Sequence, residues 1–444
     1  MLEELEKLLD EKKYKEAKLQ LNKLNSTDVA ELLEDIEPKE IIKIFKLIDK
    51  DKAADVFAYL PVEQESDILS LISDKEAVAL LDDMYADDAV DLLEEMPANV
   101  VRRLLKQCTK ETREDINKLL NYPENSAGSI MTVEYAELKD NLTIKDAIAT
   151  LKKEIEYYET INVCFIVNAQ RKLTGFIHLK DIICANDEDL VKDIVRKDVI
   201  FCKTTDDQEE AARMFQKYDL TAMPVVDSED RLVGMITIDD IVDVLQEENT
   251  EDIEKMAAIM PTHKAYFKVG VFETWKARIP WLLLLMVSAT FTGKIIQHYE
   301  SALASYVILT SFIPMLMDTA GNAGGQASVT IIRGLSLYEI EFKDLLKVIW
   351  KEMRVAVLCG ITLAVVNTIK LMIVDKVTLQ VALIVNLTLV FTIFLAKIIG
   401  STLPLFAKKV GFDPAVMASP FITTIVDACS LVIYFQIATN LLGL

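Results

Sequence analysis

An aspartate, Asp427, lies inside a strongly apolar stretch that runs from Pro420 to Phe435, near the end of the sequence. A charged carboxylate at membrane depth is energetically costly, and where one occurs it usually belongs to a functional site. We therefore predict that Asp427 takes part in the function of the protein. The alternative is a buried carboxylate whose hydrogen bonds serve the structure alone.

A second segment, Pro314 to Gly334, places polar and very small residues within an apolar run (PMLMDTAGNAGGQASVTIIRG). We expect Pro314 and the glycines to break this run, which membranes tolerate only where the backbone faces protein or a watery cavity. Asn322 would add an amide at that level, and Asp318 a second carboxylate. Close backbone approach to a pore and tight helix packing are equally good explanations of the small residues, Gly321, Ala323, Gly324 and Gly325.

The elements that must position these residues are membrane-spanning helices. Apolar runs long enough to span a bilayer occur at five places: 280–298, 301–331, 352–374, 378–404 and 414–444. Lys and Arg cluster before the first run, between the second and third, and between the fourth and fifth. By the positive-inside rule, the long N-terminal part is cytoplasmic and the C-terminus is outside.

The charge of the chain is concentrated outside these apolar runs. Residues 261–444 contain 15 basic and 10 acidic residues, whereas the first 260 residues contain 33 basic and 60 acidic ones. A net charge of −27 in the N-terminal part repels nucleic acid and attracts multivalent cations. The sequence therefore predicts divalent cations and membrane lipid as partners, and no nucleic acid.

The first 125 residues repeat a short apolar and acidic segment that ends at a proline, at Pro38, Pro61 and Pro97. Since proline starts or stops helices, this pattern predicts short helices stacked in a superhelix. Asp87 and Asp91 would lie on the solvent side of this stack. The usual interpretation of such charges is a solvated acidic face.

A clearer repeat follows, because GFIHLKDI at 175–182 returns as GMITIDDI at 234–241. Each copy follows a short apolar strand and a helix, so two helix–strand–strand–helix units are expected to pack together. This segment resembles a tandem pair of CBS domains. The resemblance implies that Thr237 and Asp240 bind an adenine nucleotide such as ATP, whereas the first copy has His178 in the place of the threonine. A purely structural repeat is the alternative.

An acidic, helix-like tract, QEENTEDIEKM, leads from the second copy to the apolar part. It predicts a connecting helix, whose placement would let the cytoplasmic charge act mechanically on the first crossing. A plain solvated linker helix is the competing interpretation.

Taken together, the Pro314–Gly334 segment and the segment DPAVMASPFITTIVDA at 413–428 resemble the membrane domain of MgtE-type magnesium channels. The order of the parts matches that family from end to end. The resemblance implies a multidomain fold: an α-helical superhelical domain (1–125), an α/β tandem CBS pair (126–248), an acidic connecting helix (249–274) and an all-α polytopic domain with five transmembrane helices (275–444). It also implies a homodimer in which Asp427 from each chain faces its copy across a pore for Mg²⁺.

The resemblance further implies feedback by cytoplasmic Mg²⁺, which would bridge acidic groups and close the pore. The expected ligands are Asp207, Glu209, Asp240, Asp243, Glu248, Glu251 and Asp252, with Asp87 and Asp91 from the helical domain and Asp413 from a membrane loop. No phosphate-cradling loop or nucleophile–base pattern occurs, which argues against an enzyme. Two alternatives stay open: a membrane-anchored sensor of nucleotide or metal without conduction, and transport of another divalent cation such as Co²⁺ or Mn²⁺.

Overall fold

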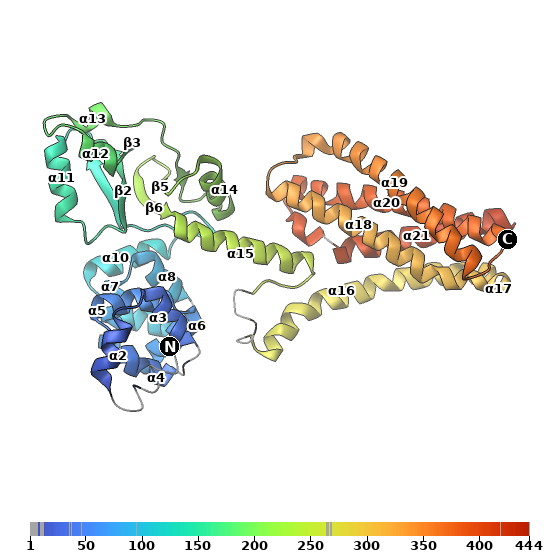
Figure 1. Ribbon diagram of the computed structural model, residues 1–444, viewed down its shortest axis with the longest axis horizontal. Coiled ribbons are helices and arrows are strands. Elements are labelled where there is room, and N and C mark those ends of the chain that lie inside the picture. Colours follow the sequence, from blue (N-terminus) through green and yellow to red (C-terminus); the bar gives the residue numbers. More distant parts are fainter. Residues whose placement is uncertain are drawn as a thin grey trace. The chain divides into compact units, whose positions relative to one another are not determined.

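The computed structural model describes residues 8, 13–34, 36, 38–45, 47–94, 96–262, 266, 269–417 and 419–443. The chain divides into two compact units, residues 1–245 and 246–444. The first unit holds the helical domain and the repeated α/β modules, and the second holds the long apolar helices (Figure 1).

Nine short helices make up the described part of the N-terminal domain, as the proline pattern predicts. They are α2 (Tyr14–Leu21), α3 (Ser26–Glu34), α4 (Pro38–Phe45), α5 (Lys50–Ala58), α6 (Val62–Leu71), α7 (Asp74–Asp83), α8 (Ala86–Glu94), α9 (Ala98–Leu105) and α10 (Lys110–Leu119). Pro38 is the first residue of α4, and Pro61 and Pro97 immediately precede α6 and α9. Proline fits these positions because the first amides of a helix have no intrahelical acceptor. Leu92, on α8, is fully buried in the stack.

The two repeated modules form two small sheets of the same design. In the first, β2 (Thr160–Val167) pairs in parallel with β1 (Tyr135–Lys139) and antiparallel with β3 (Leu173–His178). In the second, β5 (Ala222–Val226) pairs in the same way with β4 (Cys202–Lys203) and β6 (Leu232–Thr237). Side chains from both sheets, including Phe165 and Met235, pack into one buried cluster. The two modules therefore share a core.

The repeated glycine of each module has a steric cause. A Cβ atom on Gly175 would lie 2.3 Å from the carbonyl oxygen of Arg196, and one on Gly234 would lie 2.8 Å from the carbonyl oxygen of Thr132. In each case a crossing segment forms a β-bridge to the residue after the glycine. Only glycine leaves room for this close backbone approach.

Helices flank the two sheets where the sequence places them. They are α11 (Ile144–Lys153), α12 (Leu179–Cys184), α13 (Val191–Ile194) and α14 (Gln208–Tyr218). The helix after β6 is much longer than its counterpart, since α15 runs without a break from Ile238 to Met256. The predicted connecting helix, 249–274, is therefore the second half of α15 and ends eighteen residues earlier than expected. Residues 263–265 and 267–268 of that prediction lie outside the described part.

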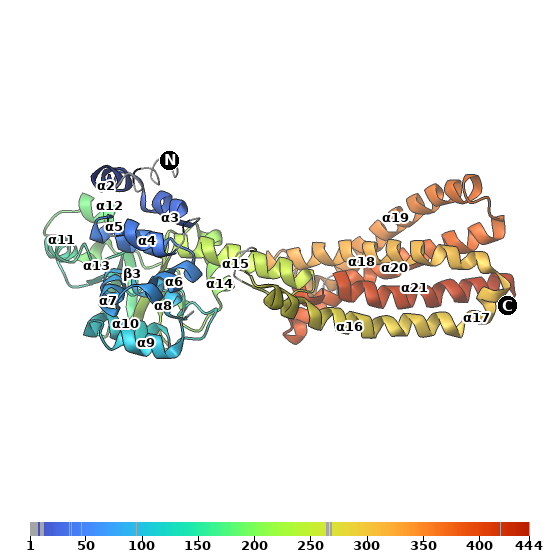
Figure 2. The same ribbon diagram turned by 90° about the horizontal axis from the view of Figure 1, so that it is seen from below.

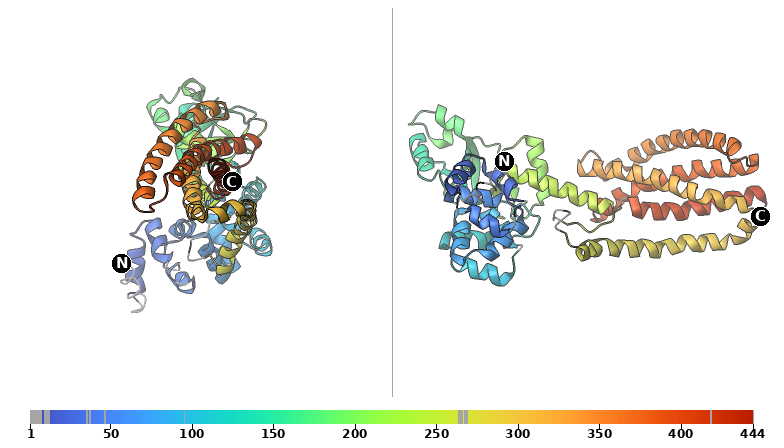
Figure 3. Two further views of the ribbon diagram at one scale, coloured as in Figure 1. Left: turned by 90° about the vertical axis from the view of Figure 1, so that its right-hand side faces the viewer. Right: turned by 60° about the horizontal axis from the view of Figure 1, so that its bottom comes forward.

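The second unit is a bundle of long helices (Figure 2). They are α16 (Val271–His298), α18 (Ile313–Ser336), α19 (Leu345–Ile373), α20 (Leu379–Val410) and α21 (Ser419–Leu442), with short helices α17 (Glu300–Ser305), η1 (Val307–Phe312), η2 (Phe342–Asp344) and η3 (Pro414–Met417) between them. Figure 3 shows α16 and α19 on opposite sides of this bundle. Among the described residues, four segments are long and apolar enough to cross a membrane, namely 271–298, 342–373, 379–410 and 414–442. The second of the five predicted crossings, 301–331, which overlaps α18, is not in this group.

The prediction of a break at the glycines is wrong. The chain is interrupted before Pro314, at α17 and η1, and α18 then continues as one helix through Gly321, Gly324 and Gly325. Pro314 sits in the first turn of α18, where it needs no amide. A Cβ atom on Gly324 would lie 2.9 Å from Ile422 of α21 and 3.3 Å from the carbonyl oxygen of Ala396 in α20. These contacts favour tight packing as the role of Gly324.

Candidate functional site

Asp427 lies in α21, one turn after the point where this helix packs against α18. Its Oδ1 atom is buried and has no hydrogen-bond partner among the described residues. The charge of Asp318, which is on the exposed surface of α18, acts on Asp427. Two carboxylates thus share one region, and at least one oxygen there is available for a cation.

Asn322 follows Asp318 by one helical turn and is also exposed. It borders an open groove of about 600 Å³ along α18, together with Gly325, Gln326, Val329 and Thr330. Amide, hydroxyl and backbone oxygens suit a hydrated hard cation. Because Asp318 and Asn322 are four residues apart in a helix, they lie on the same face of α18.

A second group of carboxylates forms where the α/β modules meet. Oxygen atoms of Glu159, Asp239 and Asp240 all lie within 4.8 Å of one another. Glu159 stands beside β2, whereas the two aspartates start α15, and the Oε2 atom of Glu159 is buried without a partner among the described residues. Carboxylate oxygens are the ligands that Mg²⁺ prefers. These residues fit a bound divalent cation.

The helical domain adds two carboxylates that face this group. Burial raises the pKa of Asp88 to about 7, and the neighbouring charge of Asp240 adds to the effect. Burial also raises the pKa of Asp87 well above its usual range, again with Asp240 as the next cause. Asp87 is only 8 % exposed, so the prediction that it lies on the solvent side of the stack is wrong.

Burial and neighbouring negative charge also raise the pKa values of carboxylates in the α/β modules. Burial and the charge of Asp240 raise the pKa of Glu159 to about 7. Burial raises the pKa of Asp240 itself to about 6, although a hydrogen bond from Thr237 opposes the shift. Mutual repulsion of buried carboxylates is relieved by a proton or by a cation. We call Asp87, Asp88, Glu159, Asp239 and Asp240 the acidic cluster.

The predicted nucleotide-binding pair, Thr237 and Asp240, is in direct contact. The Thr237 hydroxyl donates to an Asp240 carboxylate oxygen at 2.5 Å, and the Thr237 amide donates to the same oxygen at 3.2 Å. In the first module, the equivalent Asp181 instead accepts from Arg196 at 2.8 Å. The aspartate at this position of the repeat therefore has a different partner in each module.

The other predicted regulatory residues lie apart from the acidic cluster or at its edge. Asp207 accepts from the amide of Glu209 at 2.8 Å and caps α14. Asp243 follows Asp239 on α15, and burial, with a smaller contribution from Asp239, raises its pKa. Asp91 and Glu248 are on α8 and α15, and neither is among the residues whose oxygens converge.

Three further predicted residues meet at the end of α15. Lys255 forms ion pairs with Glu251 and, at 2.7 Å, with Asp413. Asp252 accepts a hydrogen bond from the hydroxyl of Ser336, the last residue of α18, at 3.3 Å. Thus Glu251 and Asp413, which the sequence predicts as Mg²⁺ ligands, hold a lysine in this structure.

Sequence reasoning missed several charged residues. Glu159 belongs to no sequence motif, and only its proximity to Asp239 and Asp240 of α15 in the folded protein identifies it. Glu352 of α19 and Lys397 of α20 are nearly fully buried and lie 3.8 Å apart. Lys397 is the single charge of its apolar run, and that signal alone could have marked it. Glu352 lies between Lys351 and Arg354, and no such signal distinguishes it.

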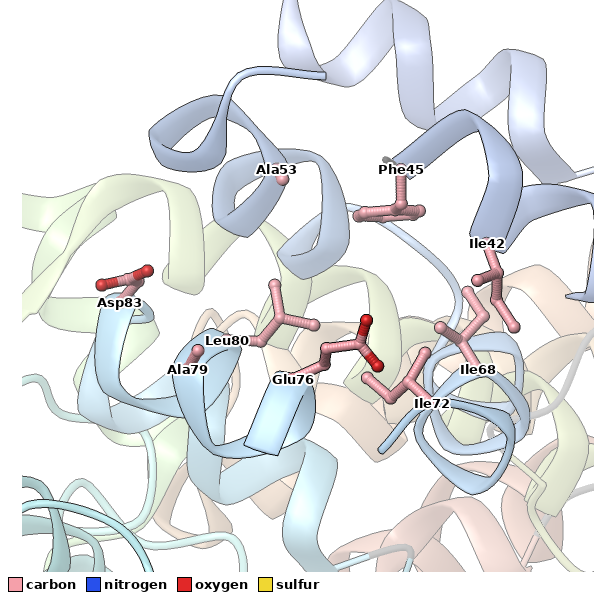
Figure 4. Close-up of a pocket in the computed structure, with 9 residues that line it drawn as sticks. All are labelled: Ile42, Phe45, Ala53, Ile68, Ile72, Glu76, Ala79, Leu80 and Asp83. Atoms are coloured by element: carbon pink, nitrogen blue, oxygen red, sulfur yellow. The ribbon is translucent and has the colours of Figure 1, made fainter. Parts of the chain in front are cut away.

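The helical domain also contains an apolar pocket of about 180 Å³ (Figure 4). Phe45, Ile72 and Leu80 line it, and the carboxylates of Glu76 and Asp83 are the charged groups at its edge. Few polar groups converge there, and a ligand site needs such groups to fix orientation. We therefore assign it no function.

Comparison with known proteins agrees with this arrangement. The MgtE intracellular N domain matches residues 24–125, and the CBS domain matches 127–187 and 191–247. The MgtE domain, described as a divalent cation transporter, matches residues 313–437. The class is therefore a multi-pass membrane transporter that also carries a CBS pair and a helical N domain.

Relatives that match along most of the chain are more specific. The magnesium transporter MgtE of Thermus thermophilus is 34 % identical over 341 residues, 77 % of this chain and 75 % of the relative. The magnesium transporter MgtE of Bacillus subtilis is 35 % identical over 328 residues, 73 % of this chain and 71 % of the relative. The chain belongs to the MgtE family of magnesium transporters, which are not enzymes.

Two solved structures resemble the first unit. The soluble part of a magnesium transporter is 30 % identical with a TM-score of 0.53, and the match covers 56 % of this chain and 99 % of that one. The cytosolic domain of the Mg²⁺ channel MgtE in complex with ATP is 30 % identical with a TM-score of 0.52, and the match covers 55 % of this chain and 100 % of that one.

Proposed function

We propose that this protein conducts Mg²⁺ into the cell through its helical membrane unit, and that Asp427 is the main cation site of the pore. The observation that carries this proposal is the buried Oδ1 atom of Asp427, which has no partner among the described residues and lies in a helix packed on α18. An orphan carboxylate oxygen is costly in a membrane. A passing cation would compensate that cost.

The same helices support a proposal for the number of crossings, the oligomeric state and the orientation of the protein. We infer that α18 is a fifth crossing, because it packs on both α20 and α21, which are apolar enough to span a bilayer. Its low hydropathy suits a helix that faces water in a pore. Two chains would bring the exposed Asp318 and Asn322 faces together, so we propose a homodimer with the pore between them. The distribution of Lys and Arg favours a cytoplasmic N-terminal part and an external C-terminus.

We propose that the acidic cluster is the internal Mg²⁺ sensor. Without a cation, the carboxylates of α8 repel those of α15, and the raised pKa values reflect this repulsion together with burial. Bound Mg²⁺ would hold the helical domain against the second CBS module and shift the pore toward its closed state. The shift requires that Mg²⁺ binds the closed state more tightly than the open one.

We propose that an adenine nucleotide such as ATP binds beside Thr237 and Asp240 and regulates this sensor. The support is the Thr237–Asp240 contact in the second module and the solved ATP complex of a related cytosolic domain. Because Asp240 belongs to the nucleotide pair and to the acidic cluster, the two ligands would influence each other. Linkage makes that influence reciprocal.

The decisive test is growth at low Mg²⁺ of a bacterium that lacks its own magnesium uptake systems. We expect the protein to restore growth and Asp427→Ala to fail at equal membrane expression. Asp375→Asn is the matched control, because Asp375 pairs with Lys370 at the end of α19 and has no pore role in this proposal. Rescue by Asp427→Ala would exclude Asp427 as the pore site.

Failure of all three proteins despite good expression would favour the non-conducting sensor. Uptake of Co²⁺ or Mn²⁺, measured in the same cells, distinguishes a transporter of another divalent cation. Oxygen ligands favour the harder ion, Mg²⁺.

A further inference from the structure

The end of α15 is attached to the membrane unit by three separate contacts. Lys255 pairs with Asp413, which precedes η3, at 2.7 Å. Asp252 accepts from Ser336 at the end of α18. Met256 packs against Ile332 of α18 and Ala415 of η3, which are both at most 2 % exposed.

The lysine is held by two carboxylates from different elements. Glu251 lies one turn earlier on α15, whereas Asp413 lies in the loop between α20 and α21. Burial tends to lower the pKa of Lys255, but the hydrogen bonds that its ammonium donates to Asp413 and Glu251 outweigh this effect and raise the pKa to about 12. The ammonium is therefore permanently charged and fills the place between these two carboxylates.

Asp413 transmits this contact to α18. Its second carboxylate oxygen accepts from the amide of Ala415 at 2.8 Å and thereby starts η3. The last residue of η3, Met417, accepts from the hydroxyl of Ser328 in α18 at 3.2 Å. A displacement of Lys255 thus reaches α18 through hydrogen-bonded groups.

The C-terminal end of α18 is fixed from the other side as well. The ammonium of Lys408 in α20 donates to the carbonyl oxygen of Leu335 at 3.0 Å and lies 4.4 Å from the ring centre of Tyr338. A cation at the C-terminus of a helix is stabilised by the helix dipole. The end of α18 is therefore a defined structure to which α15 can attach.

We propose that Lys255 is a positioning residue of the channel, whose ammonium takes the place of a divalent cation between Glu251 and Asp413 and keeps the last turn of α15 attached to α18 with or without Mg²⁺. This inference rests on the proposed function, since it concerns how the sensor reaches the pore. The joint between α15 and α18 is permanent, and Mg²⁺ acts at the acidic cluster. Movement of the CBS pair then turns or pulls α18 directly.

The test compares Lys255→Gln with Lys255→Arg in the full-length protein, as Mg²⁺ flux into liposomes at increasing Mg²⁺ on the cytoplasmic face. We expect Lys255→Gln to leave the maximal flux unchanged and to raise the Mg²⁺ concentration that halves the flux by about threefold to fivefold, the effect of losing one half-buried ion pair. Lys255→Arg should behave as the wild type. Lys351→Gln, which removes an exposed lysine of α19, is the control.

A decrease in the Mg²⁺ concentration that halves the flux of Lys255→Gln would overturn the proposal. If Glu251 and Asp413 were Mg²⁺ ligands, removal of the competing ammonium would lower the Mg²⁺ concentration needed for closure. Asp413→Asn keeps the cap of η3, since asparagine caps as well as aspartate, and removes the charge. We expect Asp413→Asn to raise the Mg²⁺ concentration that halves the flux as much as Lys255→Gln does. The double variant with both substitutions should show no larger increase than either single variant. Additive effects would count against a shared contact.

Hydrogen exchange gives a readout independent of flux. The amide of Ala257 donates to the carbonyl oxygen of Ile253 at 3.1 Å in the last turn of α15. We expect this turn to be protected in wild-type protein without Mg²⁺ and to lose protection in Lys255→Gln. Protection that appears only after Mg²⁺ is added would refute the permanent joint. A wild-type protein whose flux ignores internal Mg²⁺ would instead refute the proposed sensor, and the exchange result would still decide the joint.

Discussion

Replacement of Gly400 by alanine tests the contact between α18 and α20 on which the proposed pore depends. A Cβ atom on Gly400 would lie 2.2 Å from the carbonyl oxygen of Gly324 and 2.9 Å from its carbonyl carbon. Favourable contacts between such atoms begin at ~3.5 Å, so the two helices would have to separate by about 1 Å. The two Gly324 atoms that the new Cβ would meet belong to the backbone of a regular helix. No side-chain rotation can therefore relieve the clash.

The expected free-energy change follows from two opposing terms. Overpacking of a close-packed site costs ~1–3 kcal/mol, whereas alanine gains at most ~1 kcal/mol over glycine in helix propensity. We expect a net loss of ~1–2 kcal/mol in the free energy of unfolding. Because α18 carries the exposed Asn322 and Asp318, Mg²⁺ flux should fall as well.

Two other glycines provide matched controls. A Cβ atom on Gly360, where α19 meets α20, would lie 3.4 Å from Val390, which is ordinary contact. A Cβ atom on Gly293 in α16 would meet no atom within 4 Å. Both alanine variants should be as stable as the wild type or slightly more stable. The measurement is the thermal unfolding of detergent-solubilised protein, with flux in liposomes, and equal stability of Gly400→Ala and Gly360→Ala would refute the reasoning.

Three further predictions concern buried charge and the nucleotide. In EDTA, the raised pKa values of Asp88, Glu159 and Asp240 mean that the folded protein binds more protons than the unfolded chain between the unfolded and the folded pKa values, so the unfolding temperature should fall from about pH 4 to about pH 7. Excess Mg²⁺ should weaken or reverse this fall, and a flat profile in EDTA would contradict a buried acidic cluster. Lys397→Met should destabilise the protein by ~3–5 kcal/mol, because it leaves Glu352 buried without its cation; Lys397→Met with Glu352→Gln should recover most of this stability in the same unfolding assay. Thr237→Ala should abolish ATP binding in calorimetry, whereas Thr250→Ala, on an exposed part of α15, should not; unchanged binding in Thr237→Ala would remove this hydroxyl from the nucleotide site.

Local sequence signals predicted most of the fold of the first unit. Prolines mark the starts of α4, α6 and α9, and the repeat with glycine at Gly175 and Gly234 marks two equivalent strands. These signals succeed because each depends on a few neighbouring residues. The glycines of α18 misled the prediction because the same small residue breaks an isolated helix and permits close packing of a bundled one.

The candidate sites depended on contacts that sequence spacing cannot give. Asp87 was expected on the solvent side, yet it is buried beside Asp240, which lies far along the chain. Glu159 joins the same cluster without any motif. Lys255 and Asp413 are 158 residues apart, so only the folded chain reveals that the predicted metal ligand holds an ammonium. The contacts of these residues depend on tertiary structure, which spacing along one chain does not contain.

The buried pair of Glu352 and Lys397 has a consequence for biosynthesis. Glu352 of α19 and Lys397 of α20 are both buried where the two helices meet, and each charge would be costly in lipid if its helix entered the membrane alone. Asn367 donates to Asn386 at 2.8 Å between the same two helices, so polar groups meet at two levels. The two helices are therefore expected to leave the insertion machinery together as a hairpin, with each charge neutralised before it meets the acyl chains.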